Sequence, residues 1–393
     1  MLSALLVAGL LGGVPAAAVE PANTVRAGAE LVSGGAEARV ARERAVESGE
    51  RVEVEGERTE YASTFANPDG FTFTWEQATV PVRVSTSGGS WVTPDATLEV
   101  RPDGRVGPKA AVVDLRFSGG GDGADLVTIT RNGRSLGLGR PGALPKPVLD
   151  GDSAVYGDVL PGVDLRMTAT ADSFRELLVV KSPEAAANPQ LRRMEFSIRT
   201  DGLTVRQGAG GSMTAVDENA NVVFSAPPAL MWDSGHGAPV KDAGGAPETG
   251  VPPRGAEPDP VNGPVDGAAS AVLPIEVGGN ALVVTPDVGM LGETDEAVFP
   301  LYIDPTVGVD DTARTLLRSD GYTSYNWGNG SDNQGEGMGR CGTYSGYYCG
   351  PDYTQRLYFQ FAPDKLAGKV LDAATRRTGR ISGPAPTPSW TTS

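Results

Sequence analysis

Histidine is nearly absent from this chain of 393 residues: the only one is His236, in the sequence Ser-Gly-His-Gly. A Ser–His–Asp or Cys–His site needs a histidine that a third group holds rigidly, and glycines flank this one on both sides. We also identify no Gly-x-Ser-x-Gly nucleophile elbow of the α/β-hydrolase kind. A single histidine rules out the zinc motifs that need two or more. We therefore expect no catalytic residues, no cofactor and no enzymatic activity.

Long apolar runs are also scarce. The first, MLSALLVAGLLGGV, is too short to span a bilayer, and Pro15 and three alanines after it offer a small-residue cleavage site. This predicts a secretory signal peptide at residues 1–18, cut near Ala18, although no Lys or Arg precedes the apolar run. A buried terminal strand or helix is the alternative. No other run reaches 18 apolar residues, so we expect a secreted or cell-surface protein without a transmembrane span in its mature chain.

Only two cysteines are present, Cys341 and Cys349. In an exported protein we expect them to form a disulfide that closes one Gly- and Tyr-rich loop, worth about 2–3 kcal/mol by loop entropy. Two free thiols are the alternative if the protein stays inside the cell. Four-coordinate zinc would need two further ligands, for which the sequence offers no candidates. No metal site is therefore predicted.

Basic residues are outnumbered, since 33 Lys and Arg face 49 Asp and Glu and give a net charge of −16. Nucleic acids and anionic membranes require a basic surface, so we expect neither as a partner. Among the many carboxylates, Asp164 and Glu176 lie on two strands predicted to be adjacent, where a glycosidase pair could form. Aromatic residues make up only 6% of the chain and are sparse before Trp232, so a glycosidase site is not expected.

Glycine and proline, at 53 and 31 residues, are plentiful and mark many turns. The clearest strand pattern lies around one such turn. Val163, Leu165 and Met167 alternate with polar residues, as on a strand with one buried face. After the turn at residues 170–173, residues 174–179 are mixed on both faces, which is typical of a strand covered on both sides. An antiparallel hairpin is predicted here.

Short alternating runs with turn signals between them recur from Tyr61 to Trp232 and again over residues 271–303. This spacing predicts a mainly β fold, with a large antiparallel sandwich or barrel-like domain at residues 58–305. Residues 233–270 hold 8 Gly and 7 Pro in 38 positions and are expected to form a loop or linker inside this domain. Residues 19–57 are expected to be a polar spacer, either a marginal helix or a disordered arm.

Several segments carry a resemblance to a known group: residues 156–166 (YGDVLPGVDLR), 176–183 (ELLVVKSP), 215–218 (AVDE), 224–228 (FSAPP), 231–233 (MWD) and 299–305 (FPLYIDP). They resemble the β-rich N-terminal region of large secreted multidomain proteins of Gram-positive bacteria. In that group, modules such as laminin-G-like (LamG-like) jelly rolls, RHS-type repeats or the DNRLRE-type cell-surface module follow this region. The resemblance covers roughly residues 60–373 and implies no catalytic motif.

The amino-acid composition changes after Pro305, where the sequence becomes rich in aromatic residues, Gly and Asn. By the resemblance, residues 306–373 begin a second β module, in which further strands would follow the one at residues 356–361. We expect this module to be incomplete. Residues 374–393 contain three Arg and no acid, which favours an aberrant tail after a frameshift or premature end. A genuine short tail is the alternative.

The aromatic residues of this second part are the candidate ligand contacts. Tyr325, Trp327, Tyr347 and Tyr348 lie on Gly- and Asn-rich sequence, where exposed Tyr and Trp can stack on sugars or proteins. Equally, they can cover the core of a small module. The function we favour is a non-enzymatic extracellular module with a structural, adhesion or presenting role in a larger protein, and an unknown cell-wall, glycan or protein partner. A carbohydrate-binding or carbohydrate-active protein is the alternative.

Overall fold

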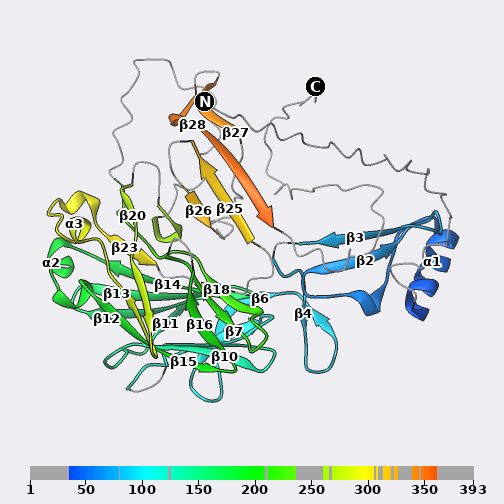
Figure 1. Ribbon diagram of the computed structural model, residues 1–393, viewed down its shortest axis with the longest axis horizontal. Coiled ribbons are helices and arrows are strands. Elements are labelled where there is room, and N and C mark those ends of the chain that lie inside the picture. Colours follow the sequence, from blue (N-terminus) through cyan, green and yellow to red (C-terminus); the bar gives the residue numbers. More distant parts are fainter. Residues whose placement is uncertain are drawn as a thin grey trace, which may run out of the picture.

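The computed structural model describes residues 35–78, 80–122, 125–208, 211–235, 260–264, 268–304, 307–308, 313–319, 323–325, 339–344 and 347–360. The predicted signal peptide, His236, Trp327 and the tail at 374–393 lie outside these residues. The described chain is mainly β and antiparallel, which confirms the predicted fold class, and two large sheets dominate it (Figure 1).

The first large sheet has eight strands in the order β21-β22-β15-β10-β9-β8-β7-β6. Most of them follow one another along the chain, so simple hairpins build this sheet. Their bounds are β6 Asp95–Val100, β7 Val106–Ala110, β8 Asp114–Phe117, β9 Val127–Arg131, β10 Arg134–Gly139, β15 Met194–Asp201, β21 Ile275–Gly278 and β22 Ala281–Val284.

The second large sheet has eleven strands, with the main order β11-β12-β13-β14-β24-β18-β17-β16. Strands β19, β20 and β23 pair beside this path. The bounds are β11 Val148–Asp150, β12 Ser153–Leu160, β13 Val163–Ala169, β14 Ser173–Val180, β16 Thr204–Gln207, β17 Met213–Val216, β18 Val222–Ala226, β19 Leu230–Trp232, β20 Ser270–Val272, β23 Leu301–Asp304 and β24 Val307–Gly308. The predicted hairpin is confirmed, because β13 pairs with β14 from Val163 opposite Val180 to Ala169 opposite Phe174.

One hydrophobic core lies between the two sheets. Val163, Leu165 and Met167 of β13 are at most 1% exposed, as their alternation predicts. Phe117 of the eight-stranded sheet meets Phe174 of the eleven-stranded sheet edge to face, with ring centroids 6.3 Å apart. The domain is thus a sandwich, and in the part of the chain that the structure describes neither sheet closes into a barrel.

The last strands of the domain lie in the middle of the larger sheet. β23 pairs on one side with β14 and on the other with β19. Two residues farther on, β24 lies between β14 and β18. Residues 301–308 therefore join two halves of the sheet that precede them in the chain, and Ile303 is fully buried there.

A smaller unit precedes the sandwich. It combines α1 Ala36–Ser48 with a three-stranded sheet of β1 Val52–Glu53, β2 Ala62–Ala66 and β3 Phe73–Gln77. Ala38, Ala41 and Ala45 share one face of α1 and pack with Val54 and Ala66. The helical alternative for this part of the spacer is the one seen. The Tyr61 hydroxyl donates to Asp172 at 3.0 Å, which links this unit to the β13–β14 turn.

The remaining elements are short or lie after the sandwich. A two-stranded ribbon and a four-stranded sheet, order β26-β25-β28-β27, complete the strands of the described residues. Their bounds are β4 Val84–Ser85, β5 Trp91–Val92, β25 Ala313–Arg318, β26 Thr323–Tyr325, β27 Gly339–Tyr344 and β28 Tyr347–Gln360. The short helices are α2 Pro183–Ala186, α3 Val288–Leu291 and the 3₁₀ turns Glu55–Glu57, Pro189–Leu191, Pro260–Asn262 and Glu296–Val298. None of the helices described here has the length and apolar character needed to cross a membrane.

Candidate functional site

Three of the four aromatic residues predicted to contact a ligand lie at strand ends of the four-stranded sheet. Tyr325 ends β26, and Tyr347 and Tyr348 begin β28. Tyr347 pairs with Tyr344 and Tyr348 with Thr343 of β27, so two of the candidates lie where β27 ends and β28 begins. Trp327 is outside the described residues. Ligand contact by these side chains stays a prediction.

The two cysteines lie on the strands of the same hairpin. Cys341 belongs to β27 and Cys349 to β28, and the register between the strands shifts after Cys341. Cys341 is paired with Tyr353, and Tyr348, the residue before Cys349, is paired with Thr343. The disulfide itself stays a prediction.

A Gly-x-Ser-x-Gly sequence is present that the sequence analysis missed, at residues 133–137. It does not form a nucleophile elbow, which needs a sharp turn from a strand into a helix. Ser135 lies inside β10, opposite Thr130 of β9 and Asp201 of β15. This serine is part of a regular sheet and has no catalytic geometry.

The carboxylates of Asp164 and Glu176 lie on opposite faces of the larger sheet. Asp164 is on the outer face, where its Oδ1 pairs with Lys181 Nζ at 2.6 Å. Glu176 is on the inner face with Phe174 and Leu178 and is 1% exposed. A glycosidase needs both carboxylates in one cleft, so these two do not form such a pair.

Glu176 is a buried carboxyl group in the core of the sandwich. Its Oε2 has no hydrogen-bond partner among the described residues, and neither does Nη1 of Arg140, which follows β10 of the facing sheet. Burial raises the pKa of Glu176 to about 8, opposed by the positive charge of Arg140 and aided by the negative charge of Asp304. The group is therefore neutral at neutral pH, which explains how an acid is tolerated in the core.

An aromatic and arginine cluster lies on the outer face of the larger sheet. Trp232 of β19 stacks on Tyr302 of β23, with ring centroids 5.5 Å apart and an interplanar angle of 18°. The guanidinium carbon of Arg175 lies 5.3 Å from the Trp232 ring. Arg175 Nε donates to Asp304 Oδ2 at 2.6 Å, which fixes the guanidinium plane.

Residues 260–264, at the end of the predicted linker, lie over this cluster. The Trp232 indole N–H donates to the carbonyl of Pro260 at 2.9 Å, and Arg175 Nη1 donates to the carbonyl of Val261 at 2.7 Å. The Val261 side chain packs against Leu177, Trp232 and Tyr302. Residues 233–270 were predicted to form a loop or linker, and their contact with the sheet was not predicted. Neither Trp232 nor Tyr302 was among the predicted ligand contacts.

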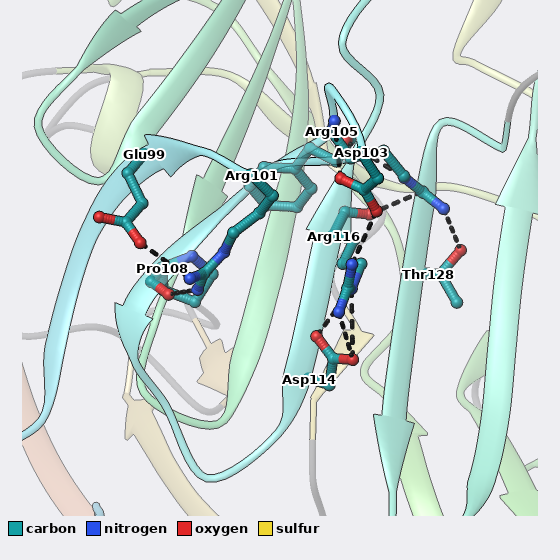
Figure 2. Close-up of polar contacts among 9 residues, drawn as sticks. Glu99, Arg101, Asp103, Arg105, Pro108, Asp114, Arg116 and Thr128 are labelled. Atoms are coloured by element: carbon teal, nitrogen blue, oxygen red, sulfur yellow. Dashed lines mark hydrogen bonds and ion pairs between the residues drawn. The ribbon is translucent and has the colours of Figure 1, made fainter.

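Arginines on the eight-stranded sheet are engaged within the fold. Arg116 Nη1 pairs with Asp103 at 2.7 Å and its Nε with Asp114 at 3.0 Å, and Arg101 Nη1 pairs with Glu99 at 2.8 Å (Figure 2). These guanidinium groups are already neutralised by carboxylates.

Arg105 ties two hairpins of the same sheet together. It donates to the carbonyls of Arg116 at 2.9 Å and Asp125 at 3.4 Å, and to the Thr128 hydroxyl at 3.2 Å. Figure 2 shows it beside Asp103, reaching past β8 to Thr128 on β9. Its role is structural.

Two further observations concern the described residues alone. A hollow of about 20 Å³ opens between β10, β15, β17 and β18, but it is lined by apolar side chains such as Leu138, Ile198 and Phe224 and has room for about one water. Within the described parts of the chain, no three His, Cys, Asp or Glu side chains come together as a metal site.

The chain resembles part of several curated proteins. It is 24% identical over 232 residues to the tRNA3(Ser)-specific nuclease WapA of Bacillus spizizenii, the tRNA(Glu)-specific nuclease WapA of Bacillus subtilis subsp. natto and the tRNA nuclease WapA of Bacillus subtilis. The aligned residues are 58% of this chain and 9% of each relative. No family model and no solved structure matches. The chain is thus distantly similar to one region of large Bacillus WapA proteins.

Proposed function

We propose that this chain is a non-enzymatic, extracellular β module with a structural or presenting role in a larger protein. The observation that supports this best is the sandwich itself: its buried ionisable groups are isolated or paired inside the fold. Glu176 and Arg140 face a closed core, and Asp164 is bound to Lys181 on the other side of the sheet.

The similarity to nucleases does not carry tRNA cleavage over to this chain. The shared region is 9% of each relative, so most of those proteins has no counterpart in the alignment. The net charge of −16 opposes the binding of RNA, and Arg101 and Arg116 are paired with carboxylates. We infer that the shared region supports or presents other parts of such proteins.

An extracellular location rests on the predicted signal peptide and on the resemblance to secreted proteins. LamG-like or DNRLRE-type modules after this region, and sugar binding by Trp327, belong to the same proposal. They predict that the protein leaves the cell and contacts wall polymers without changing them.

The test is to produce the chain in a Gram-positive host with residues 1–18 intact and, as a control, with these residues deleted. The proposal predicts protein in the medium or wall fraction only when residues 1–18 are present. Purified protein should leave a panel of wall glycans and polysaccharides unchanged in length. Retention of the intact chain in the cytosol, or turnover of any glycan that a carboxylate substitution abolishes, would contradict the proposal.

A further inference from the structure

The cluster of Arg175, Trp232 and Tyr302 has the features of a peptide-recognition site. The indole and guanidinium groups donate to two successive main-chain carbonyls, those of Pro260 and Val261. Contacts to main-chain carbonyls hold a peptide in register, while a pocket for one side chain supplies selectivity. Here that side chain is Val261, against Leu177, which is 2% exposed.

The bound segment also has the properties of a good peptide ligand. Residues 260–264 read Pro-Val-Asn-Gly-Pro, so two prolines restrict the backbone before binding and reduce the entropy lost on ordering. The Gly263 amide donates to the Pro260 carbonyl at 3.3 Å, so the segment forms a compact turn that presents Val261. The ligand that this cluster accepts is therefore an aliphatic side chain presented by a turn that begins with proline.

This contact is not needed to connect the strands on either side of it. Trp232 of β19 pairs with Ser270 of β20. The Asp233 amide donates to Ala269 at 3.1 Å, and Asp233 Oδ1 accepts from the amides of Ala269 and Gly235 at 3.0 and 2.9 Å. The ends of the long loop are thus already side by side, and about four residues would close the hairpin. The docking of residues 260–264 is an additional interaction.

We propose that Arg175, Trp232 and Tyr302 form a peptide-binding site that holds the chain's own residues 260–264 and exchanges them for the same segment of a second copy. The site holds residues 260–264 of its own chain, and a second copy carries the same segment with the same two carbonyls and the same valine. That segment of a second copy is therefore the partner we expect. Exchange of an identical element between protomers is an established route to dimers. Such an exchange would link two modules through the same contact that each already makes within its own chain.

The experiment uses an acceptor and a donor. In the acceptor, residues 236–266 are replaced by Gly-Ser-Gly-Ser, which closes the β19–β20 hairpin and vacates the site. The donor is the full chain with Trp232→Phe, which keeps an aromatic ring on Tyr302 but removes the indole donor. Binding is measured by calorimetry with a synthetic peptide of residues 258–265 (PDPVNGPV), and association by sedimentation velocity.

The acceptor should bind the peptide with a dissociation constant below about 0.1 mM and form a 1:1 complex with the donor that excess peptide dissociates. The full chain should bind free peptide at least about ten times more weakly, because its tethered segment competes at an effective concentration on the order of millimolar. Trp232→Phe in the acceptor should abolish both results. Trp91→Phe, at a tryptophan that also lies beside an arginine, should leave them unchanged.

A folded acceptor that binds neither peptide nor donor would overturn the proposal and make residues 260–264 a fixed part of the loop. If the acceptor does not fold, the full chain with Val261→Asp replaces it, because this change weakens only the tethered segment. That variant should bind the wild-type peptide better than the unsubstituted chain does. Equal affinity in the two chains would also refute exchange.

Discussion

Replacing Glu176 with Gln should remove a pH dependence of stability that this one residue creates. Burial raises the pKa of Glu176 from 4.5 to about 8, so the folded state holds a proton that the unfolded state releases. The stability that this proton provides is complete below the unfolded pKa of 4.5 and is lost as the pH rises through about 8.

The size of the effect follows from the shift. Each tenfold change in proton affinity is worth about 1.4 kcal/mol, so the move from 4.5 to about 8 corresponds to a loss of about 5 kcal/mol in the free energy of unfolding, as an upper value. Few other groups change charge in this window, because the chain has one histidine. Asp69 and Asp217 have a lowered pKa in the folded state. Their protonation at acid pH lowers the free energy of unfolding, so their pH dependence has the opposite sign to that of Glu176.

The measurement is urea unfolding of the full chain at a series of pH values from about 5 to 9, followed by tryptophan fluorescence. Glu176→Gln should match the wild type at pH 5 and exceed it by several kcal/mol at pH 9. Glu195→Gln is the matched control, since Glu195 pairs with Arg193 on the surface and both side chains are more than half exposed. A wild-type stability that does not fall between pH 5 and 8, or a fall that persists in Glu176→Gln, would refute the reasoning.

Two further predictions concern the framework of the sandwich. Arg105→Lys should lower the free energy of unfolding by about 1–3 kcal/mol, because the carbonyls of Arg116 and Asp125 lose a donor. The control Arg116→Lys changes exposed ion pairs and should lower it by less than about 1 kcal/mol. Equal losses for the two variants in urea unfolding would contradict this prediction. A chain ending at Pro300 should lose cooperative unfolding, because β23 and β24 join the two halves of the larger sheet. A chain ending at Gly308 should keep it, and cooperative melting of both chains by calorimetry would show that the central strands are dispensable.

Much of the sandwich could be predicted from local patterns. The β13–β14 hairpin was predictable because its strands are consecutive and the alternation of Val163, Leu165 and Met167 marks the inner face. The mixed faces of β14 also predicted a strand covered on both sides, and Leu177 is indeed buried on the outer face. These features depend only on residues close together in the chain.

The order of the strands was not predictable in the same way. Residues 301–308 insert between β14 and β19 or β18, elements that lie up to about 130 residues earlier, and no short-range pattern encodes that placement. The Arg175–Trp232–Tyr302 cluster was missed for the same reason, since its members come from three strands. The burial of Glu176 was also not predicted, because both faces of its strand carry apolar and polar residues, and the sequence pattern does not show which face Glu176 occupies. How the chain divides into domains stays a prediction.

The account's central claim, that this region is a non-enzymatic module, is tested most directly by incubating the purified full chain with total tRNA and Mg²⁺ and following tRNA length by denaturing electrophoresis. The account predicts no cleavage at any protein concentration and no retention of tRNA at physiological salt. Specific cleavage that follows the protein through purification and disappears with a single substitution would contradict it.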